Sequence, residues 1–322
     1  MCKIIGIDIS KQTFDVGFFE HEKWHHMKFK NTTLGFKQLE QHLDATTCLV
    51  MEASGPYYVQ LAMHFYAKGY NVSVLNPLII RRYSQTKLYR AKTDKKDAQT
   101  IAEYGSQYEL QFWKPVPKNI QKLQQLYTAI SLLDKEMQQS KRQLESFEAT
   151  GLLDHELRKV LTSIIRTLKT KKEKLEALIT AITAKHYSAT LERLQTIPGI
   201  GAKTATMLMV ISNDFEKFSN YKQLIAYVGF SPRLYQSGTS VRGRGHICKL
   251  GKSQIRKLLY LCTWSAKKYN QTCIDMYNRL KEKGKPERVI KIALANKLLK
   301  QVFAIMKNNT TYDENFVKNT CF

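Results

Sequence analysis

The sequence has 322 residues, of which 43% are hydrophobic, so the chain can bury real cores and is not a disordered tail. Lys and Arg number 51 against 27 Asp and Glu, a formal net charge of +24, which favours a polyanionic partner over a merely solubilising surface. No apolar run reaches the roughly 18–20 residues of a membrane-spanning helix, and the start lacks the order of a signal peptide. The 6 cysteines form no CxxC pair. We therefore expect a cytoplasmic protein of two to three domains with reduced thiols, without disulfides or a zinc knuckle.

Strand and helix signals alternate over the first 110 residues. Short apolar or alternating runs predict strands at Lys3–Ile9, Thr13–Phe19, Trp24–Lys30, Thr47–Glu52 and Val72–Leu75. Helical spacing predicts helices at Thr33–Leu43 and Pro56–Lys68, and Pro77 suits the first turn of a third. The order β-β-β-α-β-α-β-α predicts an α/β domain at 1–110, with a mixed sheet in the ribonuclease-H-like arrangement.

Two long amphipathic helices follow a break at Trp113–Pro117. Apolar residues recur at steps of three or four over Lys118–Phe147 and Leu153–Ala184, and the chain can reverse at Gly151. Residues 111–190 are thus predicted to form an antiparallel helical hairpin, or a coiled coil used for dimerisation. Residues 191–310 read as a mainly helical domain with glycine-rich interruptions, and 311–322 as a tail.

Four acidic residues stand where chemistry is possible. Asp8 ends the first strand and Glu52 the fourth, which are neighbours in a ribonuclease-H-like sheet, while Asp94 and Asp97 are spaced to share one face of a later helix. Gathered together, these carboxylates would repel one another unless cations neutralise them, and two Mg²⁺ ions can do so while clamping the oxygens of a phosphoryl transfer. Taken singly, each acid has a structural alternative, as a turn residue, an accident or a helix N-terminus.

A Pro-Gly-x-Gly turn lies between predicted helices at Ile197–Ala205. Gly199 and Gly201 would let backbone N–H groups approach a phosphate, and Lys203 could add a point charge. This pattern is typical of a helix-hairpin-helix element, which positions a nucleic-acid backbone without reading its sequence. A purely structural interhelical turn is the alternative.

A basic, glycine-rich stretch lies between Ser231 and Tyr260 and contains no acidic residue. Such a flexible row of cations is expected to track a nucleic-acid backbone with strong salt dependence. The stretch holds Ser237 and Ser240, but a serine hydroxyl is a poor nucleophile unless something activates it. The only local candidate is His246, which could equally contact phosphate, so local chemistry leaves both serines as solvated or phosphate-binding groups.

In their order along nearly the whole chain, these motifs resemble one known family, the DEDD transposases of the insertion-sequence 110 family, related to the Piv/MooV-type DNA invertases. The residues that carry the resemblance are Gly6–Lys11 with Asp8, Glu52–Gly55, Lys92–Ala98 with Asp94 and Asp97, Ile197–Gly201, Ala226–Pro232, Ser237-Gly238 and Gly251–Arg256. The resemblance implies a RuvC-like metal-dependent domain, a coiled-coil insertion and a C-terminal transposase domain with a nucleophilic serine. That serine falls on Ser237, with Ser240 as the second choice.

The resemblance also implies a reaction and its partners. Family members cut one strand at a time, form a covalent serine–DNA linkage and rejoin the strand through a crossed-strand intermediate. They act on donor and target double-stranded DNA recognised through a bridge RNA, as homo-oligomers (dimer or tetramer) with composite sites in the bacterial cytoplasm, nucleoid-associated when active. Two Mg²⁺ held by the four acids would supply the Lewis acid that Ser237 lacks. Arg242, Arg244, Lys249 and Lys252 would neutralise nucleic-acid charge near the break.

Two other readings of the sequence remain open. One is a RuvC-like structure-selective endonuclease, a junction resolvase that hydrolyses DNA with metal-activated water while Ser237 takes no part. The other is a nucleic-acid-binding protein whose catalytic site has decayed.

Overall fold

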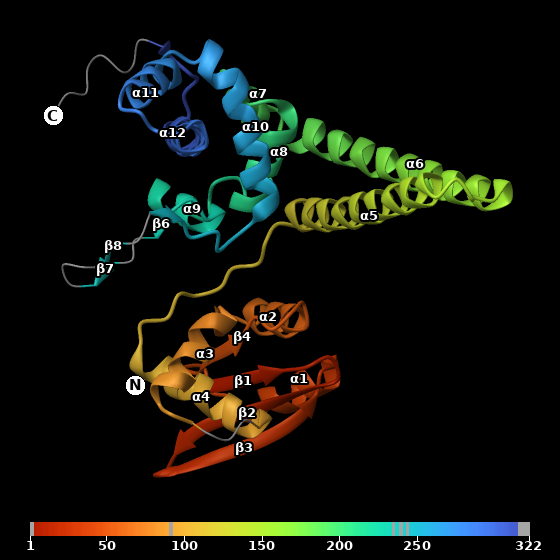
Figure 1. Ribbon diagram of the computed structural model, residues 1–322. Coiled ribbons are helices and arrows are strands. Elements are labelled where there is room, and N and C mark those ends of the chain that lie inside the picture. Colours follow the sequence, from red (N-terminus) through yellow and green to blue (C-terminus); the bar gives the residue numbers. More distant parts are fainter. Residues whose placement is uncertain (1–2, 90–92, 234–235, 238–240, 243–244, 315–322) are drawn as a thin grey trace. The chain divides into compact units, whose positions relative to one another are not determined.

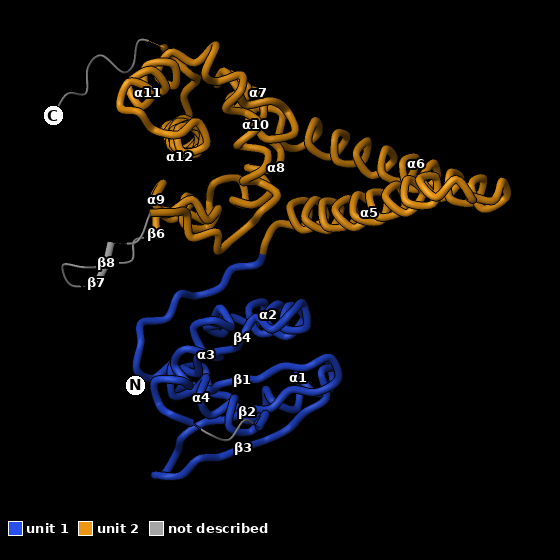
Figure 2. The backbone as a smooth tube through the Cα atoms, in the orientation of Figure 1, with its two compact units in different colours: residues 1–115 blue, residues 116–322 orange. Residues whose placement is uncertain are grey.

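The computed structural model describes residues 3–89, 93–233, 236–237, 241–242 and 245–314 of the chain. It divides into two compact units, residues 1–115 and 116–322 (Figure 2). The first is mixed α/β and the second is mostly helical (Figure 1). The long helices predicted for residues 111–190 belong to the same unit as the helices that follow them.

Unit 1 is built on a five-stranded mixed sheet. Its strands are β1 (Ile4–Ile9), β2 (Thr13–Glu20), β3 (Lys23–Lys30), β4 (Cys48–Glu52) and β5 (Asn71–Leu75). Its helices are α1 (Thr33–Glu40), α2 (Tyr58–Ala67), α3 (Pro77–Thr86) and α4 (Asp94–Gln107). The strands lie in the order β3-β2-β1-β4-β5, with β1 antiparallel to β2 and parallel to β4. The predicted element order and the predicted pairing of the first and fourth strands are both confirmed.

Side chains alternate along each strand, so the sheet has two faces. Each face packs against different helices. Ile5 and Ile7 of β1 face a core that includes Phe36 of α1 and Phe65 of α2. Val50 of β4 points to the opposite face, where its core cluster includes residues of α3 and α4. The acidic ends of the strands therefore lie against α3 and α4.

Two glycines allow α4 to lie directly on the sheet. A Cβ atom at Gly6 of β1 would fall 2.2 Å from the carbonyl oxygen of Ala98, and one at Gly17 of β2 would fall 2.8 Å from the backbone nitrogen of Gln99. Gly6 and Gly17 are partners in the antiparallel register. Only glycine permits so close an approach of helix to strand. These contacts hold the first turns of α4 over the end of β1.

Unit 2 begins with a long helical hairpin. The helices are α5 (Lys118–Ala149) and α6 (His155–His186), and Gly151 between them has a positive φ of 69°. The two predicted helices and the reversal at Gly151 are confirmed. The hairpin's buried residues are at its base, including Ile120, Leu123 and Ile179, which join the core of unit 2.

The core of unit 2 is made by the helices that follow the hairpin. They are α7 (Ser188–Gln195), α8 (Ala202–Ser212), α9 (Tyr221–Val228), α10 (Ser253–Tyr269), α11 (Gln271–Glu282) and α12 (Glu287–Asn308). Residues 204–212 of α8 are all buried, and they share one core with the apolar residues of α10 and α12. A helix that is apolar on all sides occupies the interior of a domain.

The basic stretch contains more structure than an irregular loop. It holds four two-residue strands, β6 (Pro232–Arg233), β7 (Gln236–Ser237), β8 (Val241–Arg242) and β9 (His246–Ile247). β6 pairs with β9 and β7 with β8, both antiparallel. We call these four strands the ribbon. The sequence analysis did not predict these four strands.

Among the described residues, no helix combines the length and the hydrophobicity that crossing a membrane requires.

Candidate active site

Two carboxylates meet at the ends of parallel strands. Ile7 of β1 pairs with Met51 of β4, so the next residues, Asp8 and Glu52, occupy adjacent positions at the carboxyl ends of neighbouring strands. Gly6 of β1 and Val50 of β4 face α4. Asp8 and Glu52 each follow one of these residues by two positions, and side chains alternate along a strand, so both acids are on the face that α4 covers. This is the convergence of Asp8 and Glu52 that the sequence predicts.

The first turn of α4 brings two more acids to this edge. The helix begins at Asp94 because the side chain of Thr93 caps it, its Oγ1 accepting a hydrogen bond from the backbone nitrogen of Lys96 at 3.2 Å. Asp94 and Asp97 both lie in the first turn, where the helix dipole favours negative charge. The side chain of Asp94 is largely exposed.

The electrostatics of Asp8 show that the four acids act on one another. Burial is the largest cause that raises the pKa of Asp8 from 3.8 to about 6, followed by repulsion from Asp97, Glu52, Asp94 and Asp15. Like charges near a carboxylate disfavour its ionised form. Asp8 is therefore the centre of the acidic cluster, and a cation bound there would relieve the repulsion.

A fifth acid, Asp15, lies directly across from Asp8 in the β1–β2 register and is paired with two basic side chains. Its side chain is only 6% exposed, and the imidazole Nε2 of His26 donates to its Oδ1 at 2.7 Å. The ammonium of Lys28 lies 3.2 Å from Oδ2 of Asp15 and 3.8 Å from Oδ2 of Asp94. Lys28 thus links the strand acids to the helix acids. Sequence reasoning missed this network, although the alternation of acid and cation on paired strands was a usable signal.

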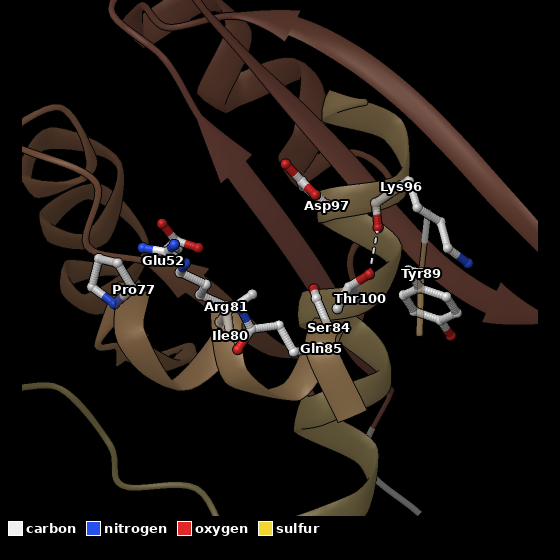
Figure 3. Close-up of a pocket in the computed structure, with 10 residues that line it drawn as sticks. All are labelled: Glu52, Pro77, Ile80, Arg81, Ser84, Gln85, Tyr89, Lys96, Asp97 and Thr100. Carbon is white, nitrogen blue, oxygen red and sulfur yellow. Dashed lines mark hydrogen bonds between the residues drawn. The ribbon is translucent and has the colours of Figure 1, made fainter. Parts of the chain in front are cut away.

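A pocket of about 520 Å³ opens beside the cluster (Figure 3). Glu52 and Asp97 lie on different sides of it. Its other lining residues come mainly from α3, α4 and the connection between them, namely Pro77, Ile80, Arg81, Ser84, Gln85, Tyr89, Lys96 and Thr100. Arg81 extends toward Glu52, whereas the ammonium of Lys96 points away from Asp97 and lies 4.0 Å from the centre of the Tyr89 ring (Figure 3). A cation beside a carboxylate suits a phosphate that meets metal-bound acids. The sequence analysis did not single out Arg81 of α3, because it stands in no recognisable motif.

The donor set suits a hard divalent cation, since it consists of carboxylate oxygens alone. Within the part of the chain that the structure describes, however, no three His, Cys, Asp or Glu side chains stand close enough together to hold a metal ion. Asp8, Glu52 and Asp97 are close enough for Glu52 and Asp97 to raise the pKa of Asp8, so these are the residues that would hold a metal ion at this strand edge.

The glycines of the Pro-Gly-x-Gly turn have different surroundings. Gly199 has a φ of 104°, and a Cβ there would fall 2.9 Å from the Cβ of Ala266, so this glycine packs against α10. Gly201 precedes α8 and has open space around it, so it can still approach a phosphate. The ammonium of Lys203 lies 3.5 Å from a carboxylate oxygen of Glu176 on α6.

The serine predicted as nucleophile lies in the ribbon. Ser237 ends β7, where its backbone pairs with Val241, and Arg242 pairs with Gln236. Lys249 is exposed with a positive φ of 57°, and Lys252 is the residue before α10. Ser240 and Arg244 lie outside the described residues.

Comparison with known proteins agrees with this arrangement. A transposase family model of the DEDD type matches residues 5–147, which contain all four acids. A second model, described as the transposase family IS116/IS110/IS902, matches residues 191–278, which contain the glycine-rich turn and the ribbon.

Relatives of nearly the same length also match. The chain is 32% identical to the pilin gene-inverting protein of Moraxella lacunata, over 96% of this chain and 97% of the relative. It is 28% identical to the transposase for insertion sequence element IS1328 of Yersinia enterocolitica, over 97% of this chain and 98% of the relative. The acidic strand edge, the ribbon and these full-length matches lead to one conclusion: the chain belongs to the DEDD transposases of the IS110 family and is a DNA transposase/recombinase.

Proposed function

We propose that this enzyme cuts and rejoins DNA through a covalent link between Ser237 and the cut strand, with the unit 1 acids holding the metal ions. The observation that carries the proposal is the gathering of Asp8, Glu52 and Asp97 at one strand edge, beside a pocket that Arg81 and Lys96 also line. The strand order, with α4 laid over β1, supports assigning unit 1 to the RuvC-like fold. The named relatives include a gene-inverting protein and transposases, so the reaction moves an element or inverts a segment.

The acidic and basic residues of the site have different proposed roles. Asp8, Glu52, Asp94 and Asp97 would hold two Mg²⁺, which supply Lewis-acid stabilisation to the phosphate and to the attacking and leaving oxygens. Lys28 pairs with both Asp15 and Asp94 and holds the side chain of Asp94 near the strands. Arg81 and Lys96 in the pocket would bind the non-bridging phosphate oxygens.

Ser237 would carry the strand between the two cuts. Its Oγ forms a bond to phosphorus while the bond from phosphorus to the leaving sugar oxygen breaks, the serine proton is released to solvent and the leaving oxygen takes up a proton. The number of phosphodiester bonds is conserved, so a hydroxyl of the partner duplex can reverse the step and release the serine. The substrates in this proposal are donor and target double-stranded DNA, with a bridge RNA as guide. Sequencing the RNA that copurifies with the native protein tests whether it binds a guide RNA.

The proposal is tested with purified protein, Mg²⁺ and DNA that carries the ends of the element. We expect a protein–DNA adduct that survives boiling in denaturant, because a phosphoserine ester is covalent. Omission of Mg²⁺ should remove the adduct. Cuts that accumulate without any adduct would identify a hydrolytic nuclease, and binding without cuts would identify a decayed site.

We also propose that the hairpin assembles the active oligomer by packing against a second copy. The face of α6 that carries Leu157, Val160 and Ile164 leaves these residues 41%, 55% and 42% exposed. They lie at steps of three and four, so they share one helix face. An apolar stripe on a projecting helix is buried when two such helices pack together.

Substituting Val160→Lys and Ile164→Lys together should therefore convert the oligomer to a monomer, because four charges would enter a dimer interface. Sedimentation equilibrium measures the mass, and far-UV circular dichroism checks that the helices persist. The control is Ser163→Lys with Thr170→Lys, at exposed positions on another face of α6. An unchanged mass in the first variant, or a monomeric wild type with DNA bound, would contradict the proposal.

A further inference from the structure

A second pocket lies in unit 2 at the foot of the ribbon. Its volume is about 520 Å³. Four of its lining side chains are cations, Lys249, Arg256, Lys257 and Arg288, and the rest are Phe230, Ile247, Tyr260 and Ile292, with no acid among them. Arg288 comes from α12 and the other three cations from the start of α10 and the residues before it. No salt bridge among the described residues involves any of these four cations.

The pocket wall is rigidly built. Gly251 has a φ of 130°, and a Cβ there would fall 2.1 Å from the carbonyl oxygen of Tyr227, so the chain before α10 packs against the end of α9. Nη1 of Arg256 donates to the carbonyl oxygen of Val228 at 2.8 Å. One guanidinium nitrogen is thereby tied to the backbone, which holds the rest of the group in place. A guanidinium fixed in this way beside three further cations is suited to a phosphodiester.

Aromatic side chains continue from the pocket along α10. Tyr260 lines the pocket, and Trp264 follows it by four residues, one helical turn on the same face. Trp264 is 51% exposed although it is the largest kind of side chain. The ammonium of Lys291 lies 3.5 Å from the centre of its ring. Lys291 is itself 4% exposed and ion-paired to Glu287 at 3.2 Å. The indole is therefore held by a buried cation and presents much of its surface to solvent.

We propose that this surface binds an unpaired stretch of nucleic acid, with a phosphodiester in the cationic pocket and bases stacked on Tyr260 and Trp264. Exposed aromatic rings beside a row of cations bind single strands, because every unpaired base offers a flat face, whereas bases in a duplex are already stacked. The phosphodiester comes from a displaced DNA strand or from a single-stranded part of an RNA. The ligand class rests on membership of a family of DNA recombinases.

The position of the pocket connects it to the proposed chemistry. Ile247 lines the pocket and pairs with Pro232 at the base of the ribbon, and Ser237 lies five residues further along the chain. Five extended residues span at most about 18 Å, a distance of about five nucleotides at the duplex rise per strand. A strand held in the pocket would thus be held within a few nucleotides of the serine, which deepens the proposed function.

The test uses the full chain and three labelled probes, a 12-nucleotide oligothymidylate, an oligouridylate of equal length and a 12-base-pair duplex. Lys257→Ala with Arg288→Ala should weaken single-strand binding at least about tenfold and lower the slope of log affinity against log salt by about 1.4, two phosphate contacts at about 0.7 each. The control, Lys171→Ala with Lys174→Ala, removes two exposed cations of α6 and should leave both quantities within twofold. The probe that binds more tightly identifies DNA or RNA as the source.

Stacking has its own readout. In a Trp24→Phe, Trp113→Phe background Trp264 is the one tryptophan that remains, and either single strand should quench its emission while the duplex should not. Unchanged affinity and slope in the pocket variant, or emission unaffected by both strands, would overturn the inference. Ser237→Ala should bind both strands normally. If the wild type binds single strands but forms no adduct, the serine mechanism alone is contradicted. If the wild type forms the adduct but the Lys257→Ala, Arg288→Ala variant binds single strands normally, the pocket alone is contradicted.

Discussion

Ser237→Ala is expected to abolish the covalent protein–DNA adduct and to reduce strand exchange by at least about 10³-fold, because no other hydroxyl takes over a lost nucleophile efficiently. DNA binding should stay within twofold of wild type, because the substitution removes one oxygen and no charge. Gel analysis under denaturing conditions measures the adduct, and a recombination assay on paired donor and target DNA measures the exchange.

The matched control for this variant is Ser240→Ala, three residues further along the sequence. This variant should keep the adduct and at least half of the activity. An adduct that survives Ser237→Ala but disappears in Ser240→Ala would move the nucleophile to the second serine. Cleavage that is unaffected by both substitutions would exclude a serine-linked mechanism.

Asp8→Asn is expected to remove activity and to stabilise the metal-free protein. Activity should fall at least about 10³-fold, because a ligand of both proposed metal functions is lost. The pKa of Asp8, about 6 when folded, is above its ordinary value of 3.8. The unfolded chain therefore releases this proton first, and the stability of the wild type falls as pH rises from about 4 to about 6.

Above pH 6 this variant should be more stable than the wild type by about 1–2 kcal/mol. The shift alone corresponds to about 3 kcal/mol, and we discount it for the solvent access of the side chain. The gain should disappear below about pH 4. Urea unfolding at pH 4, 6 and 8 in a metal chelator measures it. Added Mg²⁺ should stabilise only the wild type, since ligand that binds the folded state raises its stability.

The control for Asp8 is the acid directly across the strands. Asp15→Asn leaves His26 and Lys28 without a buried partner, so it should lower stability by about 1–3 kcal/mol at pH 8, the opposite sign. Equal effects of the two substitutions would mean that burial and repulsion together do not destabilise the ionised form of Asp8. The same conclusion would follow if the stability difference between Asp8→Asn and the wild type were the same at pH 8 as at pH 4.

Most of the fold could be predicted from sequence because its elements carry strong local signals. The alternating strands β1 to β3, the Pro77 start of α3 and the long apolar periods of α5 and α6 each follow from patterns within one segment. The ribbon was not predictable in this way. Its strands have two residues each, too short for a period, and the β6–β9 pair joins residues at both ends of the stretch, where Gly229 lies close to Leu250 and Gly251 to Tyr227.

The acids of the candidate site were predictable, but their setting was not. Asp8 and Glu52 end strands whose adjacency follows from the predicted fold, and Asp94 and Asp97 share a helix face. What places that helix over the strands is the pair Gly6 and Gly17, whose roles depend on contacts with residues some 80 to 90 positions away. The pairing of Asp15 with His26 and Lys28 likewise depends on the register of β2 and β3, which patterns within one segment do not reveal.

The nucleic-acid side of the molecule shows the same division. The basic stretch between Ser231 and Tyr260 contains Lys249 and Arg256, but Arg288 comes from α12, and the sequence did not show that these cations share a pocket. Gly199, which the sequence analysis proposed for phosphate contact, lies close to α10, and its approach to a phosphate stays a prediction. A glycine in a turn can serve a ligand or a close helix contact, and only the tertiary structure distinguishes the two.

The central claim is that acids of unit 1 hold the metal ions with which a serine of unit 2 attacks DNA. The most direct measurement is to digest the wild-type adduct with protease and nuclease and to locate the attached nucleotide by mass spectrometry, with and without Mg²⁺ and in the Asp97→Asn variant. We predict one modified residue, Ser237, which is modified only when Mg²⁺ and Asp97 are both present. A nucleotide attached to any other residue, or to Ser237 in the variant at the wild-type level, would contradict the account.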